Sequence, residues 1–554
     1  MPAGGRGPLS RRARCGAWGC AARLIRLGGK LMIRKLLVAF ALFMPTIARA
    51  EWHEAVSTNF IVYSQGSRQD AIDFAAKLER FHFMLKTIRP VPAGQANARL
   101  RVFLLADQGA VARSVGGGGV AGYYIPDARG LMLVGTRRRQ TRLTDIRSAR
   151  METGDIDPEN VLFHEYTHHF TFQYFPATYP TWYSEGFAEF WGATRILPGD
   201  VIEVGAPADH RFSTFRALGW LPLARLLRAR SYSDLRGTEI FLLYAEGWLL
   251  VRYLFEHPAR QRQIQDYLRL INVGTPIDEA IRQAIPDLDA FNNELFEYAG
   301  AARFNVVRLP FRRIEIGAIE ARTLRPAEQA LIMDEIKLSR GYPQREAAEF
   351  ADHVKDVAGR FPDDPFAIRM VMETQYLAGN GAEALAAADR LLALDPNHAR
   401  ALATKGLIRS AALAAARSTD AAAWNGARQY LRRAVNAART DPVVLEAYYR
   451  SFLIQGALPP EDAQNALYSA MELAPSDDEL RYSLARDFEQ RGMIPDAIAI
   501  IRQQAYNEPH RTETEEERRR REDRQRAAGR TRHESALEML TRLERLHAQG
   551  QPAR

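Results

Sequence analysis

The sequence predicts an α+β domain, with a small mixed sheet plus helices, followed by an all-α solenoid of helix pairs. Three observations support this fold class. Runs rich in β-branched and aromatic residues occur between residues 51 and 150, residues 155–300 have a mostly helical period, and alanine-rich amphipathic helix pairs begin near residue 327. At 554 residues the chain is too long for one core and has room for about three domains.

Residues 1–50 are expected to be an N-terminal extension and a signal peptide. Met32-Ile-Arg-Lys35 is basic, Leu36–Met44 is apolar, and Ala48-Arg49-Ala50 has the small-x-small pattern of a cleavage site. The apolar run is too short to span a bilayer comfortably. We therefore expect an exported protein, periplasmic or secreted, with no membrane span after cleavage before Glu51. Met32 begins a complete signal by itself, so a start at Met1 or at Met32 stays open.

Charge and cysteine content limit which ligands the mature chain can bind and which residues can hold a metal ion. The formal net charge is +9, but residues 1–50 contain ten Lys and Arg and no acid, which leaves −1 for residues 51–554. Nucleic-acid binding is therefore not expected, because it needs an excess of positive charge. Both cysteines, Cys15 and Cys20, precede residue 51. Any metal ion in the mature chain must then be bound by His, Asp or Glu.

Residues 51–150 are predicted to be the α/β part of the first domain, and residues 151–315 its helical part. Asn59–Tyr63, Arg99–Leu105 and Gly130–Gly135 have the composition of strands, and Asp70–Ile88 has helical periodicity. From its place in the chain order, we expect the Gly130–Gly135 strand to lie at the edge of a cleft. There it would pair with an extended peptide.

Prolines recur in the C-terminal part with a period of about 34 residues, which is typical of stacked helix pairs. Each of them separates two predicted helices. The prolines are Pro362, Pro396, Pro442, Pro475 and Pro509. The interval from Pro396 to Pro442 is longer than the others and equals one repeat plus an insertion near residues 415–426.

This period, together with Leu394-Asp-Pro-Asn397 at a repeat end, resembles the tetratricopeptide repeats. The resemblance implies a helical solenoid over residues 327–510 that binds a protein or peptide partner. A generic helical bundle is the alternative. Residues 511–554 are predicted to be a charged linker, which is densest at 511–526, and a C-terminal helix over Ala536–His547.

The motif His164-Glu165-Tyr-Thr-His168 lies in a predicted helix. Positions i and i+4 share one helix face, so the two imidazoles can bind one zinc ion. Glu165 is displaced around the helix, where it can reach a metal-bound water and act as a general base. His169 points about 100° away from His168 and is expected to be a surface neighbour of the site.

A second predicted helix supplies acids at the right distance. Glu185 follows His168 after sixteen residues, within the segment WYSEGFAEF that spans residues 182–190. Two histidines and one glutamate, with a position left open for water, are a standard ligand set for catalytic zinc. Glu189 lies one turn beyond Glu185 and can accept the second N–H of a ligating histidine. The alternative is a structural helix pair with incidental acids, although unpaired acids are costly to bury among aromatic residues.

H-E-x-x-H followed by W-x-x-E-G-x-A-E resembles the gluzincin metallopeptidases of the peptidase MA superfamily, in the pattern of the aminopeptidase-N-like enzymes. The resemblance implies a zincin-like fold with zinc bound by His164, His168 and Glu185, and with Glu165 as the general base. Ser184 stands where those enzymes carry Asn, and the gap before Glu185 is slightly short.

A second match is Tyr244-Ala-Glu-Gly247, further along the chain than Glu185. The resembling enzymes carry a Y-x-x-G at a similar distance, which implies that the Tyr244 hydroxyl stabilises the transition-state oxyanion; a tyrosine of the helix core is the alternative. Their G-x-M-E-N segment, which holds a substrate's free amino terminus, has no counterpart, and residues 118–124 contain no acid. We therefore expect a zinc metallopeptidase that is not a strict aminopeptidase. The alternative is a catalytically inactive periplasmic scaffold that acts through its repeats.

Overall fold

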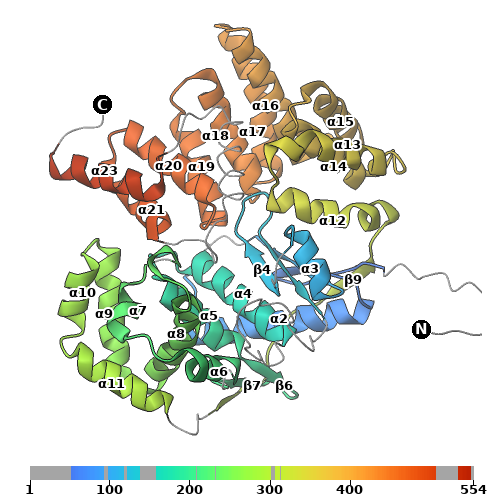
Figure 1. Ribbon diagram of the computed structural model, residues 1–554. Coiled ribbons are helices and arrows are strands. Elements are labelled where there is room, and N and C mark those ends of the chain that lie inside the picture. Colours follow the sequence, from blue (N-terminus) through green and yellow to red (C-terminus); the bar gives the residue numbers. More distant parts are fainter. Residues whose placement is uncertain are drawn as a thin grey trace, which may run out of the picture. The chain divides into compact units, whose positions relative to one another are not determined.

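The computed structural model describes residues 51–92, 98–117, 121–137, 157–206, 209–230, 232–300, 306–311, 313–506 and 534–550 (Figure 1). The signal peptide predicted in residues 1–50 and the charged run at 511–526 lie outside these residues. Residues Glu51–Arg554 cluster as one unit. The structure has a mixed sheet, many helices and a C-terminal region of repeated helix pairs, which confirms the coarse fold class.

Six strands form the main sheet in the order β4-β5-β3-β2-β1-β9. The pairs β2–β3 and β3–β5 are parallel and the others are antiparallel. The strands are β1 (His53–Val56), β2 (Phe60–Ser64), β3 (Leu100–Leu105), β4 (Gly122–Ile125), β5 (Met132–Thr136) and β9 (Glu320–Thr323).

The three predicted strands correspond to β2, β3 and β5. The prediction that the Gly130–Gly135 strand pairs with an extended peptide at the edge of a cleft is wrong, because β5 pairs with β3 on one side and with β4 on the other. All five residues of β5 are buried, which is typical of an interior strand covered on both faces. The edge next to it is β4. Its four residues, with a glycine first, are too short a run to stand out in the sequence.

Helices cover both faces of the sheet. On one face, α2 (Arg68–Ile88) and α4 (Pro158–Tyr174) bury strand residues such as Val62 and Val102 in the largest hydrophobic cluster. On the other face, α3 (Gln108–Ser114) and α12 (Pro326–Arg340) cover Phe103 and Val134. The alternation of side chains along each strand separates these two cores.

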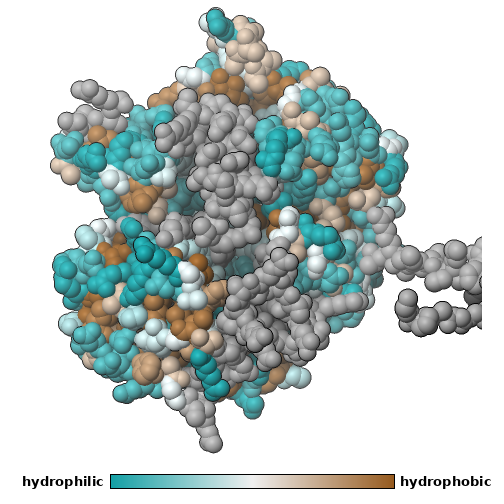
Figure 2. All heavy atoms as spheres, in the orientation of Figure 1, coloured by the Kyte–Doolittle hydropathy of each residue, from teal (hydrophilic) through white to brown (hydrophobic). Residues whose placement is uncertain are grey.

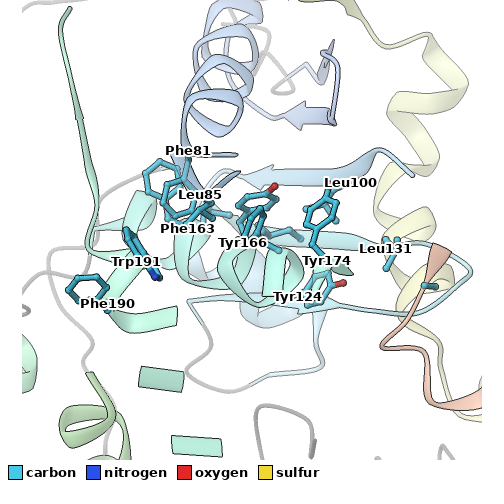
Figure 3. Close-up of a cluster of buried hydrophobic side chains, with 14 of the residues drawn as sticks. Phe81, Leu85, Leu100, Tyr124, Leu131, Phe163, Tyr166, Tyr174, Phe190 and Trp191 are labelled. Atoms are coloured by element: carbon cyan, nitrogen blue, oxygen red, sulfur yellow. The ribbon is translucent and has the colours of Figure 1, made fainter. Parts of the chain in front are cut away.

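Two glycines let α4 lie directly on the sheet. A Cβ atom on Gly135 would come within 2.5 Å of Leu162 Cδ2, and one on Gly122 within 2.7 Å of Val161 Cγ1. Asp157 caps the start of α4 by accepting a hydrogen bond from the Glu159 N–H, and proline follows at the first helical position. Figure 3 shows Phe163 of α4 lying against Phe81 of α2 in this core, where the two rings stack.

Residues 157–323 hold seven further helices and a second sheet in the described segments. The helices are α5 (Thr181–Gly192), α6 (Asp209–Leu218), α7 (Leu223–Arg228), α8 (Glu239–Glu256), α9 (Pro258–Asn272), α10 (Ile277–Ala284) and α11 (Leu288–Ala299). The antiparallel sheet is β6 (Arg195–Leu197), β7 (Val201–Val204) and β8 (Val307–Pro310). The strand β9 lies beyond residue 315 and pairs with β1 of the main sheet.

The repeat region contains helices of 12 to 17 residues in sequential pairs. They are α13 (Ala347–Ala358), α14 (Pro365–Leu377), α15 (Gly381–Leu394), α16 (Ala399–Ala415), α17 (Ala421–Ala437), α18 (Pro442–Gln455), α19 (Glu461–Leu473), α20 (Asp478–Gln490) and α21 (Ile494–Tyr506). The predicted insertion lengthens α16 and α17 to 17 residues each, and Figure 1 shows α16 extending beyond its neighbours. The C-terminal helix α23 (Ala536–Ala548) packs against α21.

On the face shown in Figure 2, the surface of the first repeat helices is largely polar. Figure 2 shows mainly hydrophilic side chains over α13 to α15, in keeping with helices that bury a single apolar stripe. In the part of the chain that the structure describes, no helix combines the length and the apolar character needed to cross a membrane.

Candidate metal centre

Helices α4 and α5 bring the predicted ligands together. Gly192 of α5 permits the close approach, since a Cβ atom there would lie 3.0 Å from both the Asn160 carbonyl oxygen and His164 Cβ. His164 and His168 lie one turn apart on α4, and Glu185 faces them from α5. Each can offer one ligand atom, and these atoms lie within 4.8 Å of one another.

The three ligand atoms form a nearly equilateral triangle. His164 Nε2 lies 3.0 Å from His168 Nε2 and 3.3 Å from Glu185 Oε2, and His168 Nε2 lies 3.6 Å from the same Glu185 oxygen. Side-chain exposure is 1% for His168, 3% for Glu185 and 15% for His164. His164 is therefore the corner of the triangle most exposed to solvent.

Each histidine has a partner on its other ring nitrogen. Glu189 Oε1 lies 3.3 Å from His164 Nδ1, and the Ser184 hydroxyl lies 3.3 Å from His168 Nδ1. Ser184, the residue that departs from the aminopeptidase-N-like pattern, therefore faces a histidine of the triangle. Glu189 in turn accepts two hydrogen bonds from Arg211 of α6, one of them 2.9 Å long from Nε to Oε2.

The charges around His164 favour its protonated form when no metal is bound. Burial acts to lower the pKa of His164, but hydrogen bonds and charges from Glu185 and Glu189 outweigh burial and raise the pKa to about 10. Burial likewise acts to lower the pKa of Arg211, and Glu189 reverses the effect. The site is therefore rich in negative charge that attracts a cation.

Glu165 follows His164 on α4 and is partly exposed. Its carboxylate lies on the helix that carries both histidines, displaced around the axis from them. Its Oε2 atom is buried, although the residue as a whole is partly exposed.

Tyr244 of α8 joins the site through Tyr232. The Tyr232 hydroxyl lies 2.7 Å from Glu185 Oε1 and 2.7 Å from the Tyr244 hydroxyl. Burial, followed by the charge of Glu185, raises the pKa of both tyrosines well above the usual value. The Arg211 guanidinium lies 4.9 Å from the centre of the Tyr244 ring, at cation–π distance.

The expectation of His169 as a surface neighbour is wrong. His169 is only 2% exposed, because the edge strand β4 packs against this side of α4. Its Nδ1 lies 3.0 Å from the Tyr124 hydroxyl of β4. Burial, helped by the nearby His82, lowers the pKa of His169 to about 3, so its ring is neutral.

Tyr232 and Arg211 were missed in the sequence. Tyr232 lies in the short 3-10 helix η1 (Tyr232–Asp234), and Arg211 lies on α6 between β7 and α7. Neither position belongs to a periodic pattern with the H-E-x-x-H helix. The one available signal was the charge of Arg211, since a buried acid such as Glu189 needs a cationic partner.

Comparison with known proteins gives little. A scan against protein-family models gives no match, and a search of the curated proteins gives no match either. Among solved structures, the chain is similar to a thermophilic TPR protein of Thermus thermophilus, with 18% sequence identity and a TM-score of 0.26. That match covers 33% of this chain and 89% of the other chain.

Proposed function

We propose that this chain is an exported zinc metallopeptidase of the gluzincin type, in which the helical repeats bind a protein or peptide partner. His164, His168 and Glu185 hold the zinc ion, Glu165 is the general base, and Tyr244 stabilises the oxyanion. The observation that carries the proposal is the triangle of ligand atoms between α4 and α5.

The fit of this triangle to zinc supports the proposal. Ligand atoms bound at about 2.0–2.1 Å to one tetrahedral ion are about 3.3–3.4 Å apart. The three edges here are 3.0, 3.3 and 3.6 Å. Imidazole and carboxylate donors without thiolate suit a catalytic zinc site, and residues 51–554 contain no cysteine.

The surrounding residues support a hydrolytic role. A bound zinc ion supplies Lewis acidity and a water of lowered pKa. Glu165 accepts a proton from the attacking water and passes it to the leaving amine. Glu189 fixes the tautomer of His164 through Nδ1, and Arg211 holds Glu189 in turn.

The edge strand β4 suits an extended peptide as substrate. Gly122 packs against Val161 and Tyr124 bonds His169, so β4 runs alongside the part of α4 that carries the motif. In the described part of the sheet, β4 pairs only with β5. A substrate backbone can add to its other side by strand pairing, which needs no free amino terminus. This arrangement favours an endopeptidase over a strict aminopeptidase.

The decisive experiment combines metal analysis with peptide-library digestion, on residues 51–554 and on the Glu165→Gln variant. About one zinc ion per chain in both proteins, with peptide cleavage only in the unchanged chain, supports the proposal. Absence of both zinc and cleavage from the unchanged chain contradicts it and favours the scaffold that acts through its repeats.

A further inference from the structure

Tyr232 links the proposed metal ligand Glu185 to the proposed electrophile Tyr244. We propose that Tyr232 is a positioning residue, which fixes the carboxylate of Glu185 and the hydroxyl of Tyr244 in one hydrogen-bonded chain. This inference rests on the proposed function. It assigns a role to a residue that neither the H-E-x-x-H pattern nor the Y-x-x-G pattern contains.

The direction of the hydrogen bonds follows from the donors available. A carboxylate only accepts hydrogen bonds, so Tyr232 donates its single proton to Glu185 Oε1 at 2.7 Å. The oxygen of Tyr232 can then only accept from Tyr244, again at 2.7 Å. The chain therefore runs from Tyr244 through Tyr232 to Glu185.

Because of this hydrogen-bonded chain, the two oxygens of Glu185 have different contacts. Oε2 faces His164 and His168 at 3.3 and 3.6 Å, whereas Oε1 is held by Tyr232. A carboxylate held at one oxygen cannot rotate freely about its side chain. Tyr232 therefore orients the other oxygen toward the position of the metal.

The same contact fixes Tyr244. Its ring lies 6.3 Å from that of Tyr232 at an interplanar angle of 28°, and the Arg211 guanidinium lies over it. The single proton of Tyr244 points to Tyr232 in this arrangement, so it must turn away from Tyr232 to meet the oxyanion, while the Tyr244 oxygen stays where the contact has placed it. Loss of the Tyr232 hydroxyl leaves the ring in place but releases the group that is proposed to meet the oxyanion.

Tyr232 is rigid enough for such a role. Its side chain is 3% exposed and belongs to the main hydrophobic cluster. Its carbonyl oxygen accepts a backbone hydrogen bond from Leu235, which closes the turn before α8. A hydroxyl buried to this extent needs partners, and both partners here are site residues.

The test uses Tyr232→Phe in the chain from residue 51, with Tyr267→Phe as a matched control. Tyr267 is also fully buried, and its hydroxyl donates to the Leu227 carbonyl at 2.7 Å, away from the ligand triangle. The zinc dissociation constant of each metal-free protein is measured by competition with a chelator. Tyr232→Phe should raise this constant about 10- to 100-fold, and Tyr267→Phe should leave it within about twofold.

Kinetics at saturating zinc test the hydrogen bond between Tyr232 and Tyr244. Tyr232→Phe should lower kcat about 10- to 100-fold with little change in KM, because substrate binding does not use this hydroxyl. The Tyr232→Phe/Tyr244→Phe double variant should lose less than the product of the two single losses, since part of the effect of Tyr232 passes through Tyr244.

Two results would overturn the inference. One is a zinc dissociation constant for Tyr232→Phe that matches the Tyr267→Phe control, and the other is a fully additive effect in the double variant. Failure of the proposed function looks different. An unchanged chain that binds zinc but cleaves no peptide refutes the hydrolysis, while the comparison of zinc affinities still decides the Tyr232–Glu185 contact.

Discussion

Gly186 of α5 and Gly247 of α8 touch backbone to backbone. A Cβ atom on Gly186 would lie 2.2 Å from the Gly247 carbonyl oxygen, and one on Gly247 would lie 2.6 Å from the Trp182 carbonyl oxygen. Each glycine belongs to one of the two segments singled out in the sequence, next to Glu185 and three residues after Tyr244. The contact explains how two helices that are far apart in the sequence can share one site.

Gly247→Ala should therefore separate α8 from α5. Overpacking typically costs about 1–3 kcal/mol of folding free energy, and the shift should also weaken zinc binding by moving Tyr244 and its partner away from Glu185. Urea denaturation and chelator competition measure the two effects. Gly426→Ala in α17 is the control, because a Cβ atom there meets nothing within 4 Å. It should be neutral or stabilise the helix by about 1 kcal/mol.

Variants of the candidate site should differ in their effects on zinc binding and on peptide cleavage. His164→Ala and Glu185→Ala should lose zinc together with peptide cleavage, since each removes one of the three proposed ligands. Tyr244→Phe should keep zinc and lower kcat by about 10²–10³-fold, the usual effect of losing one oxyanion donor. Metal analysis and steady-state kinetics on the same preparations measure both. If Glu185→Ala retained one zinc ion per chain, the ligand assignment would be wrong.

Glu246→Gln should stabilise the protein in a pH-dependent way. Glu246 is fully buried on α8 and accepts a hydrogen bond from the Leu221 N–H. Burial raises its pKa from 4.5 to about 9, so the folded chain keeps a proton that the unfolded chain loses between these pH values. The contribution of Glu246 to stability is therefore highest below pH 4.5 and falls as the pH rises toward 9.

Glutamine does not titrate and keeps the acceptor oxygen for Leu221. The free energy of unfolding of the variant should equal that of the unchanged chain near pH 4.5 and exceed it by roughly 3 kcal/mol at pH 7. Urea denaturation at several pH values measures the difference. If the difference in unfolding free energy between the two proteins did not change between pH 4.5 and 8, Glu246 would not be a neutral carboxyl in the folded chain.

Glu335→Gln should have the opposite pH dependence. Glu335 of α12 forms ion pairs with Arg101 of β3 and Arg369 of α14, and its side chain is 10% exposed. Burial acts to raise its pKa, but the two guanidinium groups outweigh burial and lower the pKa to about 2. This contribution to stability is present above pH 4.5 and is lost as the pH falls toward 2.

Removing the Glu335 carboxylate leaves the largely buried Arg101 guanidinium without this anion, whereas Arg369 keeps its ion pair with Glu373 at 3.3 Å. We expect a loss of about 3 kcal/mol at pH 7, which should shrink below pH 4.5. Chemical denaturation at pH 7 and pH 4 compares the two conditions. Arg228, whose ion pair with Asp278 is exposed on both sides, offers the control variant Arg228→Gln, which should cost less.

The sequence could predict the parts of the site that follow a period. His164 and His168 share a helix face by spacing alone, and the acids at 185 and 189 repeat the same i, i+4 spacing on the next helix. Tyr232 could not be predicted, because it lies in a non-periodic turn. It reaches Glu185 from a segment 47 residues further along the chain, a contact that no local pattern encodes.

Three strands of the main sheet could also be predicted from a local sequence pattern. The strands β2, β3 and β5 are apolar runs with buried residues on both faces or on alternate positions. The strand β9 is the short polar segment Glu-Ala-Arg-Thr, with little burial, and no local signal marks it as part of the sheet. Its place is set by pairing with β1, which lies near the other end of the domain's sequence.

That long-range pairing has a consequence for synthesis and for truncation. The residues of β1 leave the ribosome long before Glu320–Thr323 can join them. Until then the outer rim of β1 is an open edge with unpaired N–H and C=O groups. A fragment that stops at residue 315 would keep that edge permanently, and we expect it to self-associate where the chain reaching residue 340 stays dispersed.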